Sequence, residues 1–234
     1  MKKDRSGDLV WAGPIFIVIL VAAFAFMGFL PPLPPSWGKE QVAQYYRDNQ
    51  TQILAGSMLV MQFSGLMFLW VAGVSSQLRR IEGEGSRALS YAQLLFGFLA
   101  NLLFLIMTLS WTVAAFRADR SAELVVMLND LGWLAIVMPV LSVSLQGFVI
   151  GLAILSDSRP TPLFPRWAAY LNFWVGVLFL PGAVAPFFKT GPFAWNGFLV
   201  FWVPIAAFIG WVFLMAWLVS RAAAVPDDVK TANQ

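Results

Sequence analysis

The chain contains neither cysteine nor histidine. Without cysteine there are no disulfides, no thiolate nucleophile and no iron–sulfur ligation. Without histidine the chain lacks the commonest metal ligand and the usual general base, which excludes a histidine-ligated haem or di-iron centre. A site made of carboxylates alone would need several of them inside the apolar segments, where only Asp130 is available. The sequence therefore predicts no metal and no cofactor.

Charge is also scarce, at 12% of residues against 59% hydrophobic, whereas soluble domains carry about 25% charged residues. Six long apolar runs hold most of the chain, and the charges lie in the gaps between them. About 20 helical residues cross a hydrocarbon core. The pattern predicts an all-α polytopic membrane protein, a bundle of six transmembrane helices in a single domain over 1–234. The expected spans are about 9–30, 53–74, 89–115, 124–155, 167–188 and 193–219.

The first run follows a basic N-terminus, as in a signal peptide, but its roughly 22 residues exceed the 7–15 of a signal core. We therefore expect it to be a retained span. The Pro-rich segment 31–35 that follows predicts an extended strut on the outer side. Ser36 is a candidate N-cap for a short interfacial helix that reaches about Asn49.

Basic residues are distributed unevenly between the two sets of loops. Five lie in one set, namely Lys39, Arg47, Arg117, Arg120 and Lys189. Ten lie in the other, namely Lys2, Lys3, Arg5, Arg79, Arg80, Arg87, Arg159, Arg166, Arg221 and Lys230. The excess marks the cytoplasmic side, so we expect a cell (inner) membrane protein with both termini in the cytoplasm. The net charge of +3 then reflects topology and does not indicate a nucleic-acid partner.

Asp130, beside Asn129, is the only carboxylate well inside a predicted helical run. A charged group at membrane depth is costly and is a functional hypothesis by default. Two interpretations remain open. The carboxylate either serves a ligand or a proton, or it pairs with Arg117 or Arg120 and fixes the connection between the third and fourth spans.

Amides lie near the middle of two other spans, at Gln62 and Asn101. An unpaired amide in hydrocarbon costs several kcal/mol, so each needs a partner helix or a wet cavity. Gly97, Asn101 and Thr108 share one helical face that should point into the bundle. Two interpretations of this face remain open. It forms interhelical hydrogen bonds, with Gln62 as one candidate partner of Asn101, or it binds a ligand.

Gln146 and Asn172 lie in the cytoplasmic third of the fourth and fifth spans and are expected to form a structural polar pair. Gly147 and Gly151 form a small-xxx-small motif beside Gln146 that allows close helix packing.

Proline and glycine interrupt the fifth span at Pro181, Gly182 and Pro186. Proline frees backbone carbonyls, which must be buried or face water. Pro139 and Pro204 are expected to kink the fourth and sixth helices in the same way. Eleven tryptophans and 21 phenylalanines supply the walls of a pocket for a flat lipophilic ligand, or else simple packing.

No nucleophile–base pair can be argued from these residues, so a non-enzymatic protein is favoured. The leading hypothesis is an integral membrane protein that binds or passes a lipophilic or weakly polar small molecule. Alternatives are an accessory subunit of a larger membrane complex, or an enzyme that uses a lone carboxylate. The expected partners are the lipid bilayer and either such a ligand or a complex partner. The candidate ligand-binding residues are Asp130, Asn129, Asn101, Gln62, Pro181 and Gly182.

Overall fold

The computed structural model describes residues 5–117 and 119–225, and these ranges contain helices and connecting turns but no strand. Six helical segments are long and apolar enough to cross a membrane. The expected all-α protein with six candidate spans is confirmed. The segments are Ser6–Phe26, Gln50–Glu82, Ala88–Phe116, Ala122–Leu155, Arg166–Phe187 and Phe198–Ala224.

Five of these six spans are divided, and only α6 (Ala88–Phe116) runs without a break. The first two spans consist of α1 (Ser6–Leu9) with α2 (Ala12–Phe26), and α4 (Gln50–Phe63) with α5 (Gly65–Glu82). The fourth consists of α7 (Ala122–Val137) and α8 (Leu141–Leu155). The fifth joins α9 (Arg166–Phe179) to the 3₁₀ helix η1 (Leu180–Phe187), and the sixth joins the π-helix η2 (Phe198–Trp202) to α10 (Val203–Ala224).

Prolines lie at several of the breaks, among them Pro181 at the start of η1. Pro139 lies between α7 and α8, where its missing N–H and its ring prevent a continuous helix. The expected single helix over 124–155 is therefore two helices. Pro204 lies in the first turn of α10, where proline is tolerated, and the irregularity precedes it as η2.

The segment between the first two spans combines irregular chain with a short helix, α3 (Lys39–Asp48). The helix begins later than expected, because Gly38 rather than Ser36 is its N-cap. The Gly38 N–H donates to Oε1 of Gln41 at 3.0 Å, which satisfies an amide at the helix start. In the Pro-rich segment, Leu33 is buried and its carbonyl accepts a hydrogen bond from Trp195 Nε1 at 2.7 Å.

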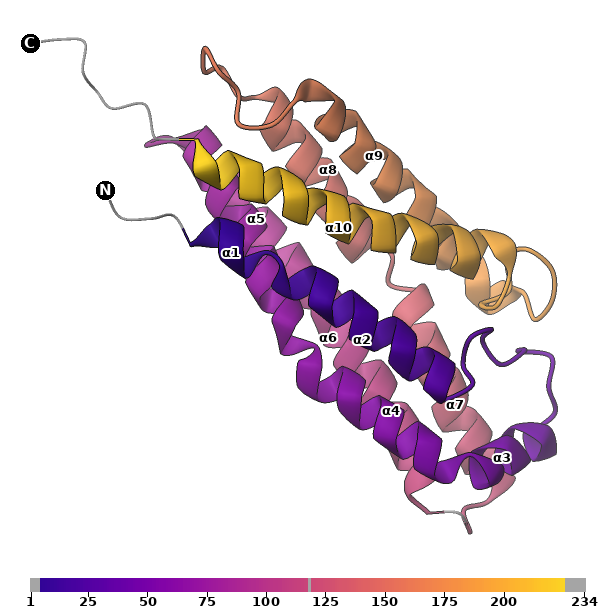
Figure 1. Ribbon diagram of the computed structural model, residues 1–234. Coiled ribbons are helices and arrows are strands. Elements are labelled where there is room, and N and C mark those ends of the chain that lie inside the picture. The colour runs from indigo at the N-terminus through magenta and orange to yellow at the C-terminus, as the bar shows by residue number, and fades with distance from the viewer. Residues whose placement is uncertain (1–4, 118, 226–234) are drawn as a thin grey trace, which may run out of the picture.

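The six spans run roughly side by side, so that the bundle has two distinct ends (Figure 1). The end where α1 begins and α10 finishes, called here the termini end, also holds the last turns of α5 and the start of α9. The opposite end, called here the α3 end, holds α3 and the start of α7. Because successive spans run in opposite directions and there are six of them, the start of the first span and the end of the sixth lie at the same end of the bundle.

The first and last helices meet at the termini end. Ser220 of α10 donates to the Gly7 carbonyl of α1 at 2.7 Å and accepts a hydrogen bond from Trp11 Nε1 at 2.8 Å. A Cβ on Gly7 would lie 2.9 Å from Ala223 Cβ, so glycine permits this close approach. α2 and α10 then separate toward the α3 end (Figure 1).

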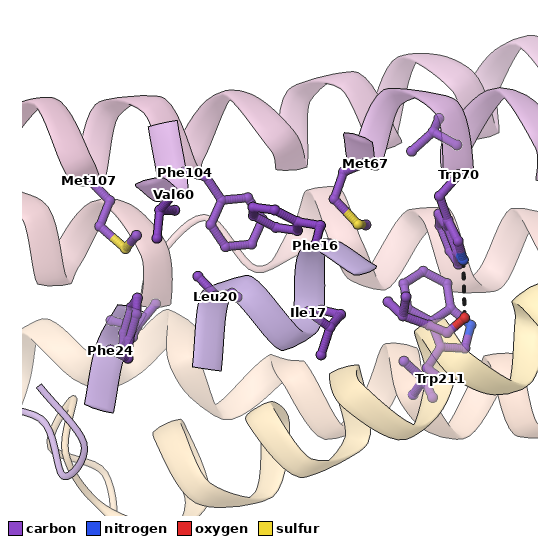
Figure 2. Close-up of a cluster of buried hydrophobic side chains, with 14 of the residues drawn as sticks. Phe16, Ile17, Leu20, Phe24, Val60, Met67, Trp70, Phe104, Met107 and Trp211 are labelled. Atoms are coloured by element: carbon purple, nitrogen blue, oxygen red, sulfur yellow. Dashed lines mark hydrogen bonds between the residues drawn. The ribbon is translucent and has the colours of Figure 1, made fainter. Parts of the chain in front are cut away.

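Large aromatic side chains fill the interior of the bundle. Trp70, Trp111, Trp133 and Trp211 are fully buried, in four different helices. Trp70 packs edge-on against Trp211, with 5.0 Å between ring centroids, and donates from Nε1 to the Val212 carbonyl at 3.1 Å (Figure 2). The indole thus buries its rings and satisfies its polar atom at once.

Candidate functional site

Asp130 lies at the α3 end of the bundle, where α3 packs on α7. Nδ2 of the buried Asn129 donates to Oδ1 of Asp130 at 3.0 Å, and the Tyr46 hydroxyl donates to Oδ1 of Asn129 at 3.3 Å. Burial, followed by the charge of Asp130, raises the pKa of Tyr46 well above its ordinary value, so the hydroxyl remains a donor. The three side chains form a short hydrogen-bonded chain from α3 to α7.

The expected ion pair of Asp130 with Arg117 or Arg120 is not among the contacts of the described residues. Lys189 acts on Asp130 electrostatically, without an ion pair of bonding length between them. The ion pair that does join α3 to α7 is formed by Lys39 and Glu123. The hydrogen bond and the charge of Glu123 raise the pKa of Lys39. This pair ties the fourth span to the helix between the first two spans, and it is not the link between the third and fourth spans that was expected of Asp130.

Asn101 is buried on α6, and its Nδ2 donates to the Ser64 carbonyl at 3.1 Å. Ser64 is the residue at which α4 gives way to α5. Gln62, the expected partner, has an exposed side chain instead. Asn101 thus joins two spans, but through a backbone carbonyl at a helix break.

Gln146 and Asn172 are both buried but form no hydrogen bond with each other. Oδ1 of Asn172 accepts from Trp211 Nε1 at 2.8 Å, and its Nδ2 donates to the Ala168 carbonyl at 2.8 Å, so it joins α9 to α10. Gly147 allows the expected close packing, since a Cβ there would lie 2.7 Å from the Asn172 carbonyl oxygen. The two amides therefore act separately.

Several buried amide atoms on α6 and α8 have no hydrogen-bond partner. They are Oδ1 of Asn101, Nε2 of Gln146 and both side-chain polar atoms of Gln93. Gln93, Gly97 and Asn101 share one face of α6, and a Cβ on Gly97 would lie 2.7 Å from Gln146 Nε2. Thr108, by contrast, is satisfied by the Phe104 carbonyl at 2.7 Å. Unpaired buried amides need water or a ligand, so this face of α6 is a polar seam inside the bundle.

The interrupted fifth span packs against the interrupted fourth span. A Cβ on Gly182 would lie 2.2 Å from the Val137 carbonyl oxygen and 2.6 Å from Cγ1 of Val140. Pro181 and Gly182 belong to η1, and Val137 ends α7. Irregular backbone at membrane depth is tolerated where it is buried in protein or lines a cavity.

Next to these breaks lies a cavity of about 100 Å³. Every side chain that lines it is apolar, and the walls come from α2, α6, the junction of α7 with α8, the end of α9, η2 and α10. The wall residues include Leu20, Phe24, Phe104, Val140, Phe201 and Ile205. Asp130 is not among its lining residues. Figure 2 shows Leu20, Phe24 and Phe104 together beside the buried core.

A second apolar hollow, of about 250 Å³, lies between α2 and α10 where these helices separate. It shares four wall residues with the cavity: Leu20, Phe24, Phe201 and Ile205. Its outer rim includes Trp202, whose side chain is 40% exposed. We call this hollow the α2–α10 groove. The groove therefore lies next to the cavity, on the outer side of the bundle.

The arrangement can bind but offers little for catalysis. The cavity walls present neither an acid nor a base. The described residues contain no group of three acidic side chains that would hold a metal ion. The sequence predicts kinks at Pro139 and Pro204 and an interruption at Pro181, Gly182 and Pro186. Nothing in it marks the apolar wall residues, which resemble any core side chain.

Comparisons of the chain with known protein families, with curated proteins and with solved structures found no match.

Proposed function

We propose that this integral membrane protein is not an enzyme and that it binds a lipophilic molecule taken up from the bilayer. The observation that supports this most is the apolar cavity at the helix breaks together with the α2–α10 groove that opens toward lipid. A ligand would enter sideways between α2 and α10 and place its most apolar part in the cavity.

The size of the cavity favours one class of ligand. An apolar cavity of about 150 Å³ holds a single benzene molecule, so a space of about 100 Å³ takes a short stretch of hydrocarbon chain. A fused-ring molecule would not enter it. The larger α2–α10 groove holds the remainder of the chain. The proposed ligand is therefore a chain-like lipid, such as an acyl or polyprenyl compound.

Photolabelling tests this proposal. The full chain, in phosphatidylcholine vesicles, is irradiated with a fatty-acid analogue that carries a diazirine in its chain, and labelled peptides are mapped by mass spectrometry. We expect labels on α2 and α10, at residues such as Leu20 and Ile205. Ala100→Leu, which adds three carbons to a cavity wall residue of α6, should reduce this labelling severalfold.

Ala92→Leu is the matched control, since it makes the same change on the same helix outside the cavity. It should label like the original protein. Equal labelling of the Ala100→Leu variant, or labels spread evenly over all lipid-facing helices, would overturn the proposal. Thermal unfolding of each variant in detergent establishes that the comparison is between folded proteins.

A further inference from the structure

A polar groove lies at the termini end, between the last turns of α5 and the first turns of α6. Its volume is about 450 Å³, and its walls contain no acidic residue. Three arginines line it, Arg79 and Arg80 from α5 and Arg87 from the loop before α6. We call it the α5–α6 groove. It lies apart from the apolar cavity and shares no residue with it.

The three arginines differ in how they are held. Arg80 is fixed by the end of α10, since it donates to the Ala222 carbonyl at 2.8 Å and to the Val225 carbonyl at 2.6 Å. Arg79 and Arg87 are exposed and form no ion pair or hydrogen bond with any described residue. Two guanidinium groups therefore face the same groove without an anion.

Two acids, Glu82 and Glu84, lie between Arg79 and Arg87 along the chain, and neither of them lines the groove. The Glu82 carboxylate accepts hydrogen bonds from the backbone N–H groups of Leu89 and Ser90, at 2.8 and 3.0 Å. It caps the start of α6 and satisfies amides that have no partner within the helix. Since Glu82 serves the backbone and Glu84 is not part of the groove wall, Arg79 and Arg87 supply the groove with positive charge that an outside anion can meet.

The groove also has an apolar part directed toward the membrane interior. Ala72 precedes Arg79 by seven residues, and Leu94 follows Arg87 by seven. Seven residues of helix correspond to about 10 Å. Leu94 and Tyr91 are 38% and 50% exposed, so they face lipid beside the groove. The arginines thus lie at one end of the groove and apolar side chains at the other. The distance between them matches the length of a lipid's glycerol and its first methylene groups.

We propose that the α5–α6 groove binds the phosphodiester headgroup of an anionic phospholipid, with Arg79 and Arg87 as its cationic contacts. Guanidinium groups bind phosphate oxygens through paired, charge-assisted hydrogen bonds. The hydroxyls of Ser76 and Tyr91 line the same groove and supply further donors. Ala72 and Leu94 contact the glycerol and the upper acyl chains. Basic hollows of this kind between membrane helices favour anionic lipid headgroups.

Native mass spectrometry of the full chain in mild detergent tests this site. Phosphatidylglycerol is titrated as the anionic probe and phosphatidylcholine as its zwitterionic counterpart. We expect phosphatidylglycerol adducts to survive at activation energies that remove phosphatidylcholine. Arg79→Gln/Arg87→Gln should bind phosphatidylglycerol at least about tenfold more weakly, because each surface cation contributes appreciably to anionic lipid binding.

Arg166→Gln/Arg221→Gln is the matched control, because it removes two positive charges from the same end of the bundle outside the groove. It should bind phosphatidylglycerol like the original protein. Equal weakening in both double variants would show a general charge effect and overturn the site, as would unchanged binding in Arg79→Gln/Arg87→Gln. Displacement of the lipid by millimolar inorganic phosphate would overturn the lipid assignment, since the groove would then accept the free anion. Failure of the cavity experiment leaves this proposal unaffected.

Discussion

Asn101 shows how one buried amide can stabilise a helix break in another span. Its Nδ2 donates to the Ser64 carbonyl, which also accepts from the Met67 N–H at 3.0 Å, while its Oδ1 has no partner. Asn101→Leu removes both the bond and the unsatisfied oxygen, so we expect a loss of less than about 1 kcal/mol in the free energy of unfolding. Thermal unfolding in detergent measures this change.

Asn101→Asp makes the opposite substitution at the same place. It replaces the donor with an acceptor that faces a carbonyl oxygen, and it should destabilise the protein more than Asn101→Leu does. Greater damage from leucine than from aspartate would contradict the assigned hydrogen bond. Loss of lipid photolabelling in Asn101→Leu without loss of stability would make Asn101 a ligand contact.

Asp157 holds the turn between α8 and α9, outside the spans. Its buried carboxylate accepts from Arg159 Nε at 2.8 Å and from the Leu163 N–H at 2.9 Å. Burial alone would raise the pKa of Asp157, but these hydrogen bonds outweigh burial and hold the pKa below its ordinary value of 3.8. The unfolded chain has the higher pKa, so the stabilisation is complete above about pH 4 and is lost as the pH falls further.

Asp157→Asn should therefore cost about 1–3 kcal/mol at neutral pH and less at acidic pH. The measurement is thermal unfolding across pH 3 to 7, with the exposed neighbour change Ser158→Ala as control. A constant difference between the original protein and Asp157→Asn at every pH would argue against the carboxylate as the source.

At the scale of the helices, the close packing of η1 against the break between α7 and α8 depends on Gly182. The Cβ of Gly182→Ala would lie 2.2 Å from the Val137 carbonyl oxygen, which is backbone and cannot rotate away. We expect Gly182→Ala to destabilise the protein by about 1–3 kcal/mol. Gly210 lies in the middle of α10, and a Cβ there would meet no neighbouring atom within 4 Å. Gly210→Ala should therefore stabilise the protein by up to about 1 kcal/mol. Thermal unfolding measures both variants. If Gly182→Ala and Gly210→Ala changed the stability in the same direction, the close contact of Gly182 with Val137 would be contradicted.

Hydropathy predicted the six spans because apolar length alone determines which segments can cross a membrane. It did not predict where each span divides. Pro139 indicated the break in the fourth span and Pro181 the one in the fifth, since proline cannot continue a helix. The break at Ser64 has no proline and is compensated by Asn101 from another span, which is a tertiary contact. The cavity residues were missed for a similar reason, because Leu20 or Phe201 lines a cavity only through the arrangement of its neighbours.

At the scale of the whole molecule, the bundle has two distinct ends. Gln44 is exposed at the α3 end and Glu84 at the termini end. From the excess of basic residues at the termini end, we expect that end to face the cytoplasm. The chain has no cysteine, so Gln44→Cys and Glu84→Cys each introduce a single reactive thiol.

A membrane-impermeant maleimide applied to intact cells should label Gln44→Cys and leave Glu84→Cys unlabelled. Permeabilised cells provide the control, in which both thiols should react. Labelling of Glu84→Cys alone in intact cells would reverse the orientation, and it would move the α5–α6 groove to the other leaflet without changing its lipid chemistry.

The α2–α10 groove has a consequence for biosynthesis, because its walls come from helices far apart in the sequence. The groove needs both α2 and α10, so it does not exist until the ribosome has made the chain as far as α10. Membrane proteins are inserted from the N-terminus onward, and Leu20 and Phe24 meet lipid or a translocation factor before Phe201 and Ile205 are synthesised. A lipid that occupies the groove is therefore acquired by the finished bundle, and a chain truncated before α10 has no such groove.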